Sequence, residues 1–412
     1  MSSDGKFDKR GTGRRIDALG KPIVSIVEQQ KFALVPPPHP DVEPNTPSLE
    51  PAESLEAELT RVGEHLPKLK PYNPKLIGRG GNSAVFEVTG HPEVIVKVDY
   101  KQLVWIARNR PRLIKQKIDP RELEELKDYA SREQSRFNQY SGYFEKDAVL
   151  KTRFTIGTVP FTPRLFEFIS RAPMPPLDLK VSTPILVTAS VQVQEKLPAE
   201  ANGSDSYSFT SGYLERDPHL TEAELRAIDR VLFDEKNPNE DEAMNYFMAI
   251  DRRDGEPKWR EIVSSMIIDS QLNKVVKDFV ERVLKYVHET GEMPDFAGSD
   301  NFVLFQQNHR WKIVAVDPLA GERVLLGLEK ALFNIANRST EQDDDNRIMN
   351  GLCGARFINA LAIICHSDGR IRFDQPISAF THQIITMGRR ILKVQVDPVL
   401  GLAETVPKPR DD

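Results

Sequence analysis

The residues best suited to chemistry are a lysine, an asparagine and two aspartates near the ends of predicted strands. Lys97 lies in a run that is otherwise valine and isoleucine, where an ammonium group either reaches solvent or serves a purpose. Asn301 and Asp317 stand at the two ends of a predicted hairpin, and Asp295 lies in the turn before it. Amide and carboxylate oxygens suit Mg²⁺, and a fixed ammonium suits phosphate oxygens. These residue types indicate a site for a metal-bound polyphosphate.

A glycine-rich turn stands between two β-rich runs before Lys97. It contains Gly78, Gly80 and Ser83, and Val85 lies in the run that follows. Glycines let a backbone lie close over phosphate groups, where a side chain would collide. Because these glycines open a hairpin rather than a helix, the pattern counts against a Rossmann or Walker loop.

A carboxylate interrupts the apolar face of the helix that we expect to begin at Asp119-Pro120, a good N-cap and first-turn pair. The other positions on that face are Leu126, Ala130, Phe137, Tyr140 and Phe144. A buried carboxylate is costly unless it is paired, so we expect Glu133 to pair with the ammonium of Lys97. Three glutamates nearer the helix start are alternatives: Glu122, Glu124 and Glu125.

The hydrophobic pattern predicts strands in the first half of the chain and mostly helices in the second. The expected strands cover 75–77, 84–88, 94–98, 149–159 and 184–193, with a hairpin over 302–305 and 311–316. The expected later helices cover 221–233, 269–288, 328–337 and 347–366. The polar segment 201–211 is expected to be a flexible loop.

The composition excludes several classes of protein but does not identify the class. The 412 residues include 56 basic and 61 acidic ones, a formal net charge of -5 that does not favour nucleic-acid binding. Cys353 and Cys365 form no C-x-x-C pair, which excludes a disulfide framework and predicts two core thiols. No apolar run is long enough for a membrane span, and the start lacks the apolar core of a secretory signal. We therefore expect a cytoplasmic protein; its oligomeric state is open.

The ordered features from Lys75 to Asp317 resemble the protein-kinase-like superfamily. The resemblance implies a two-lobed α+β fold, with ATP and Mg²⁺ bound between the lobes. We expect an antiparallel β lobe with a long paired helix over 71–197 and a mainly α-helical lobe over 198–397. We also expect a disordered, proline-rich tail over 1–70 and a flexible tail over 398–412.

The glycine-rich loop of that superfamily matches Gly78, Gly80 and Ser83, with Val85 following. The nucleotide-binding lysine matches Lys97, at the end of Val94-Ile95-Val96-Lys97. The glutamate of the paired helix matches Glu133.

The segment from Glu195 to Leu197 resembles the hinge that meets the adenine ring. Asp295 stands where the catalytic aspartate is expected. Asn301 and Asp317 match the two metal ligands.

The sequence departs from the superfamily pattern around its catalytic loop. Met293-Pro294-Asp295 lacks the usual histidine and arginine, and the spacing to Asn301 is one position longer than usual. Asp300 is a second candidate in the same turn, and Asp317-Pro318-Leu319 replaces the usual Asp-Phe-Gly. No Ala-Pro-Glu motif follows, so the ATP-binding half of the resemblance is the stronger half.

These observations favour an atypical kinase that transfers the γ-phosphoryl group of ATP to a hydroxyl, on a protein acceptor in preference to a small molecule. One alternative is a pseudokinase that serves as a nucleotide-binding or scaffolding module. Another is an enzyme of the same fold that transfers AMP or phosphorylates a small molecule.

Overall fold

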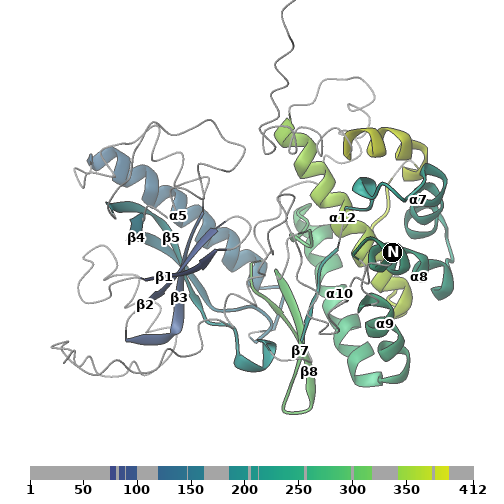
Figure 1. The fold of residues 1–412 in the computed structure, drawn as a ribbon, viewed down its shortest axis with the longest axis horizontal. Helices are drawn as coiled ribbons and strands as arrows, with labels where there is room; N and C mark the ends of the chain where they lie inside the picture. Colours follow the sequence, from purple (N-terminus) through teal and green to yellow (C-terminus); the bar gives the residue numbers. More distant parts are fainter. Residues whose placement is uncertain are drawn as a thin grey trace, which may run out of the picture.

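The computed structural model describes residues 75–79, 83–88, 90–99, 119–145, 147–161, 185–202, 206–211, 213–254, 258–297, 301–317, 342–373 and 376–388. These residues form an α+β protein, as predicted. They contain a five-stranded sheet and a three-stranded sheet. Figure 1 shows the larger sheet with one long helix in one part of the molecule, a bundle of helices in the other, and the smaller sheet between them. The expected tails and the expected helix 328–337 lie outside the described residues.

An antiparallel sheet of five strands contains Lys97 near its middle. Its strands are β1 (Lys75–Arg79), β2 (Ser83–Val88), β3 (His91–Asp99), β4 (Thr152–Phe161) and β5 (Ile185–Glu195). The order is β1-β2-β3-β5-β4. Lys97 on β3 pairs with Val85 on one side and with Gln192 on the other. The neighbouring valines and isoleucine of β3 are buried, so the strand is held firmly around the lysine.

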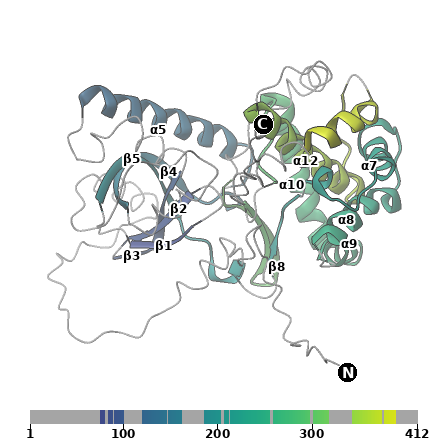
Figure 2. The same ribbon diagram turned by 45° about the horizontal axis from the view of Figure 1, so that its top comes forward.

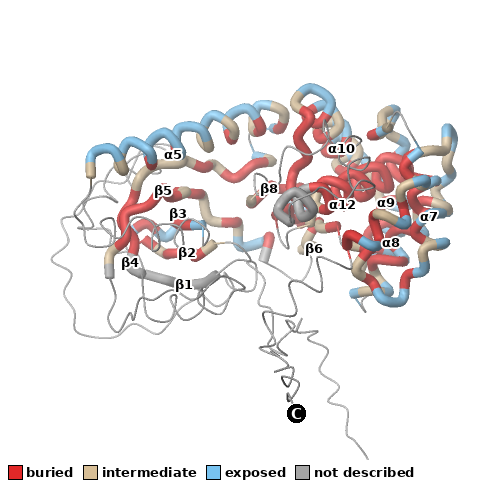
Figure 3. Tube along the Cα trace, turned by 90° about the horizontal axis from the view of Figure 1, so that it is seen from above, coloured by how far each residue is buried: buried red, intermediate tan, exposed pale blue. Residues whose placement is uncertain are grey.

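Helix α5 (Pro120–Ser141) lies along the sheet beside β4 and β5, as Figure 2 shows. The predicted N-cap is confirmed, because the Asp119 carboxylate accepts a hydrogen bond from the backbone N–H of Arg121. Figure 3 shows the exposed outer side of the helix. Gln134 reaches the edge of the sheet, where its Oε1 accepts from the backbone N–H of Phe154 at 2.8 Å. This bond fixes the helix against β4.

The helical bundle is built around α12 (Gln342–Ile364), which is its most buried helix. Its members are α7 (Glu222–Asp229), the π-helical turn η4 (Arg230–Asp234), α8 (Glu240–Asp254), α9 (Lys258–Ile268), α10 (Ser270–Thr290) and α12. The described residues also contain three short 3-10 helices: η2 (Ala199–Asn202), η3 (Leu214–Arg216) and η6 (Ile377–Phe380). Figure 3 shows α12 buried within the bundle, and residues 348–365 of this segment are buried apart from Asn350. Both cysteines are among them and carry free thiols, as predicted.

Two predicted helix boundaries are confirmed. Thr221 and Glu224 form the expected capping box at the start of α7. Gly291 ends α10 with a φ of 68°, a left-handed conformation that glycine adopts without strain. Helices α8 and α9 were not predicted. Within the described residues, no helix is both long and apolar enough to cross a membrane.

A three-stranded sheet joins the two larger parts. It consists of β6 (Tyr207–Ser208), β7 (Phe302–Gln307) and β8 (Arg310–Ala315), in that order. The predicted hairpin is confirmed, since β7 and β8 pair antiparallel. The expected flexible loop over 201–211 is wrong where the structure describes it. Tyr207 pairs with Leu304, and Phe209 is fully buried, because the aromatic side chains of this segment pack into the core.

The end of β8 is bonded directly to the five-stranded sheet. The buried Gln194 side chain donates from Nε2 to the backbone oxygen of Val316 at 2.7 Å and to Oγ1 of Thr152 at 3.1 Å. Close by, the backbone N–H of Leu150 donates to the oxygen of Ala315 at 3.1 Å. These bonds place Asp317, the next residue after Val316, beside the sheet that carries Lys97.

Replacing Gln194 with leucine is expected to lower the free energy of unfolding by about 1 kcal/mol. The buried oxygen of Val316 loses its side-chain donor, and this loss is partly offset because the substitution also removes the buried Oε1 of Gln194, which has no hydrogen-bond partner in the described structure. Urea denaturation of the Gln194→Leu variant measures the loss. Gln139→Leu, on the exposed side of α5, is the control and should change stability little. Equal stability of the two variants would contradict the proposed linking role of Gln194.

Candidate functional site

Lys97 is a buried cation in the middle of the sheet. Its side chain is 2% exposed, and Nζ has no hydrogen-bond partner within the described part of the chain. Burial lowers the pKa of Lys97, while the negative charge of Asp317 acts in the opposite direction. A buried ammonium group without a hydrogen-bond partner is energetically costly, so this position is one where an anionic ligand brings a large gain.

Asp295, Asn301 and Asp317 come from two segments that are bonded to each other. The backbone oxygen of Asn301 accepts from the N–H of Val316 at 2.7 Å and of Asp317 at 3.2 Å. The amide Nδ2 of Asn301 donates to the backbone oxygen of Asp295 at 3.0 Å. Asp295 in turn accepts at Oδ1 from the backbone N–H of Ala297 at 3.0 Å. The structure therefore brings these three residues together, with Asp317 acting electrostatically on Lys97.

The burial of these residues differs in a way that matters for binding. Asp295 and Asn301 are buried, whereas Asp317 is partly exposed. Asp317 is thus the carboxylate that remains open to solvent beside a buried ammonium. Asp300, the alternative in the same turn, lies outside the described residues, as do Pro318 and Leu319.

The expected ion pair between Lys97 and Glu133 is not formed, which corrects the sequence prediction. Glu133 is 23% exposed, and its Oε2 lies 3.9 Å from Nη1 of Arg136, one turn along α5. Its charge acts on Tyr129 instead, whose pKa is raised to about 12, mainly by burial and then by Glu133 and Asp99. Because the Glu133 carboxylate keeps contact with solvent and lies near Arg136, it does not need Lys97 as a partner.

The described part of the glycine-rich segment lies on β1 and β2. Gly78 pairs with Val85 across the hairpin, and Ser83 begins β2 opposite Asp99. Gly80 lies outside the described residues. Because Val85 also pairs with Lys97, the hairpin places the predicted glycine-rich turn on the same sheet as the lysine.

The predicted hinge residues have two different environments. Glu195 is bonded to Lys151, whose backbone N–H donates to its Oε2 at 3.2 Å and whose backbone oxygen accepts from its N–H at 2.9 Å. Leu197 is buried in a small apolar cluster with Val303 and Val314 of the β7–β8 hairpin. The cluster joins the end of β5 to the strands that position Asn301 and Asp317.

Sequence reasoning missed Gln194 as a positioning residue. The available signal was a polar side chain on a strand whose valine neighbours are buried, within Val191-Gln192-Val193-Gln194. Its bond to Val316 could not be foreseen, because the two residues lie 122 positions apart.

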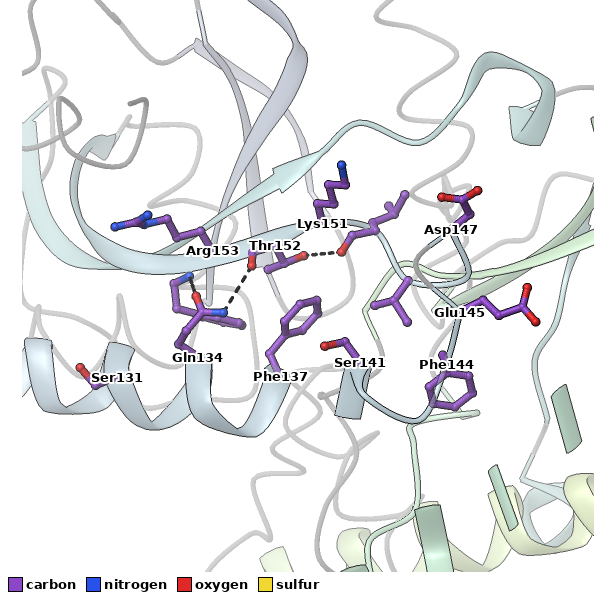
Figure 4. Close-up of a pocket in the computed structure, with 13 residues that line it drawn as sticks. Ser131, Gln134, Phe137, Ser141, Phe144, Glu145, Asp147, Lys151, Thr152 and Arg153 are labelled. Carbon is purple, nitrogen blue, oxygen red and sulfur yellow. Dashed lines mark hydrogen bonds between the residues drawn. The ribbon is translucent and has the colours of Figure 1, made fainter. Parts of the chain in front are cut away.

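A separate cavity of about 770 Å³ opens between α5 and the start of β4, as Figure 4 shows. Its walls include Phe137 and Phe154, whose ring centroids lie 6.2 Å apart, and Gln134 with its bonds to β4. None of the predicted site residues lines this cavity. It is therefore distinct from the cluster around Lys97 and Asp317.

The described residues contain no group of three or more histidine, cysteine, aspartate or glutamate side chains that could hold a metal ion without other ligands. A cation at Asp317 and Asn301 would therefore need further ligands, such as phosphate oxygens and water. No known protein family, curated protein or solved structure matches this chain.

Proposed function

We propose that this protein is an atypical kinase, which transfers the γ-phosphoryl group of ATP to a hydroxyl acceptor. The observation that carries the proposal is the buried ammonium of Lys97, which has no hydrogen-bond partner within the described residues and lies near the carboxylate of Asp317. Such a group gains most from a ligand with several anionic oxygens. The phosphates of a nucleotide have this chemistry.

Asp317 and Asn301 would hold Mg²⁺ through a carboxylate oxygen and an amide oxygen, the hard ligands that this cation prefers. They are held together by the backbone bonds between Asn301 and the end of β8. When bound there, Mg²⁺ would neutralise negative charge on the phosphate oxygens. The residues present therefore fit Mg²⁺ carried in by a nucleotide, with one carboxylate and one amide from the protein.

Asp295 is the proposed general base. In the proposed reaction the acceptor oxygen forms a bond to the γ-phosphorus, and the bond from that phosphorus to the β–γ bridging oxygen breaks. ADP leaves with the electron pair of the broken bond, and the hydroxyl proton passes to the carboxylate of Asp295. The bonds that Asp295 makes with Ala297 and Asn301 hold the base in a fixed orientation.

The arrangement of elements supports a kinase-like fold as part of this proposal. The glycine-containing hairpin, the lysine strand and the long helix α5 come first, followed by β5 and a helical bundle. The loop with Asp295 follows α10, and the β7–β8 hairpin separates Asn301 from Asp317. This order is the one that the sequence resemblance implies for the two lobes.

The transfer reaction is tested with γ-labelled ATP and a panel of protein and small-molecule hydroxyl acceptors. Asp317→Asn and Asp295→Asn are each expected to slow transfer at least about 100-fold, since one removes a metal ligand and the other the base. Asp241→Asn, on the exposed surface of α8, is the matched control and should retain wild-type rates. Equal transfer by all four proteins would exclude the assignment.

A nucleotide-binding module without transfer activity is the second candidate. Met293 and Pro294, where kinases carry histidine and arginine, are both buried, so the loop before Asp295 is held by apolar packing. Binding of Mg-ATP by the wild-type protein, without label transfer to any acceptor, would favour this candidate. Labelled AMP on the product in place of phosphate would favour AMP transfer.

A further inference from the structure

Arg216 is a partly buried cation near the proposed base. Its guanidinium carbon lies 4.0 Å from the ring centroid of Tyr213, a cation–π contact. Its Nε is buried and has no hydrogen-bond partner within the described residues, and Arg216 forms no ion pair there. Arginine carries five N–H donors in a planar fork that fits phosphate and carboxylate oxygens. Arg216 is thus presented for a ligand rather than paired within the fold.

The segment that carries Arg216 is bonded to the loop of Asp295. Both the backbone N–H and the hydroxyl of Ser211 donate to the backbone oxygen of Phe296, at 2.7 and 2.9 Å. The hydroxyl of Tyr213 donates to Oδ1 of Asn350 on α12. Ser211 therefore lies beside the Asp295 loop, and Tyr213 lies against α12.

The same helix also contacts the loop of Asp295. A Cβ atom on Gly354 of α12 would lie 2.7 Å from the Met293 side chain, so helix and loop are in close contact. Burial raises the pKa of neighbouring Cys353 to about 12; the positive charges of Arg216 and Arg253 act against this rise, and the negative charges of Asp295 and Asp229 add to it.

We infer that Arg216 binds an oxyanion, a phosphate or carboxylate group, on the acceptor whose hydroxyl is activated by Asp295. This inference rests on the proposed function. Arg216 stacks on Tyr213, and both Tyr213 and the Asp295 loop contact the same part of α12, so we expect the oxyanion and the hydroxyl to lie on one small molecule. The acceptor class is therefore a small anionic alcohol, in place of the protein acceptor favoured from the sequence.

Calorimetric titration with inorganic phosphate and with acetate tests the inference, in the presence of Mg²⁺ and a non-hydrolysable ATP analogue that fills the nucleotide site. The wild-type protein should bind at least one of the two anions, and Arg216→Ala should weaken that binding about tenfold or more. Arg310→Ala, which removes an exposed arginine of β8, is the charge-matched control and should bind as the wild type does. Arg216→Lys should retain part of the affinity, because it keeps the charge and loses the planar fork.

Comparing the affinities for phosphate and for acetate shows which kind of oxyanion the acceptor carries. Tighter binding of phosphate assigns a phosphate ester, and tighter binding of acetate assigns a carboxylate. Equal binding by wild type and a folded Arg216→Ala, or no binding of either anion, would overturn the inference. Stronger binding of a phosphopeptide than of the free anion would overturn the small-molecule assignment.

A separate measurement checks the nucleotide site: the change in melting temperature of the wild-type protein when Mg-ATP is added. Anion binding that depends on Arg216 in a protein without such a shift would overturn the acceptor role and the proposed function together. A normal nucleotide shift without Arg216-dependent anion binding would overturn only the present inference.

Discussion

The Lys97→Met variant is expected to be more stable than the wild-type protein and unable to bind nucleotide. Methionine has a similar length and removes the burial cost of an ammonium that has no hydrogen-bond partner in the described structure. The gain in unfolding free energy should be about 1–3 kcal/mol, the usual cost of leaving a buried polar group unsatisfied. Urea denaturation without nucleotide measures it. A lysine that only stabilised the fold would give the opposite sign: its replacement by methionine would lower the free energy of unfolding.

The gain should depend on pH in a defined direction. Burial lowers the pKa of Lys97 below its ordinary value of 10.5, so the unfolded chain binds this proton more tightly than the folded one. Wild-type stability therefore rises as pH increases from the lowered pKa toward 10.5. The advantage of Lys97→Met should shrink over the same interval, because the wild-type lysine is then neutral.

An exposed lysine provides the control for this variant. Lys274 lies on the outer surface of α10, and Lys274→Met should leave both stability and nucleotide binding nearly unchanged. A Lys97→Met protein that is less stable than wild type at neutral pH would show that the ammonium is compensated within the fold, and would contradict the assigned role.

Replacing Arg356 is expected to cause the largest loss of stability. This residue on α12 is 1% exposed and is bonded to two buried carboxylates. It donates from Nε to Oδ1 of Asp229 at 2.6 Å and from Nη1 to Oε1 of Glu215. Arg356→Met leaves both carboxylates buried without their cation, which should cost about 3–5 kcal/mol. Chemical denaturation at neutral pH measures the loss.

The pH dependence of Arg356→Met distinguishes this cause from poor packing. Burial, and then the charge of Asp234, already raise the pKa of Asp229 above its ordinary value of 3.8. A carboxyl group with a raised folded pKa destabilises the fold as pH rises from 3.8 through that folded pKa. The deficit of the variant should therefore be smallest near pH 4 and largest at neutral pH.

Two further variants complete this test. Adding Asp229→Asn to Arg356→Met should recover part of the lost stability, because one buried charge is removed. Arg310→Met, at an exposed position, should have little effect. A deficit that is the same at pH 4 and pH 7 would contradict the electrostatic explanation.

The sequence was sufficient to predict the secondary-structure elements around Lys97, because those predictions depend only on residues close to one another in the chain. A lysine among valines predicts a strand with one unusual residue, and β3 has this pattern. The capping residues of α7 and α10 depend on neighbours within a few positions, so their boundaries could also be predicted. The segment after Asp295 was recognised in the same way, from the alternation of short apolar runs and polar turns.

The remaining features depend on contacts between distant residues. Glu133 lies on a mostly apolar face, but its actual neighbour Arg136 is on its own helix, and the pattern could not show how far this position is solvated. The polar composition of 201–211 concealed Phe209, which is buried against Phe279 and Phe357. Arg356 lies in an apolar run, and its carboxylate partners could not be identified before the fold was known.

The central claim is that Lys97 and Asp317 form a site for the phosphates of a metal-bound nucleotide. Calorimetric titration with ATP, with and without Mg²⁺, tests it on the wild-type and Lys97→Met proteins. We expect the wild type to bind ATP more tightly with Mg²⁺, and the folded Lys97→Met protein to lose this binding. Unchanged binding by Lys97→Met, or no binding by the wild type under either condition, would contradict the account.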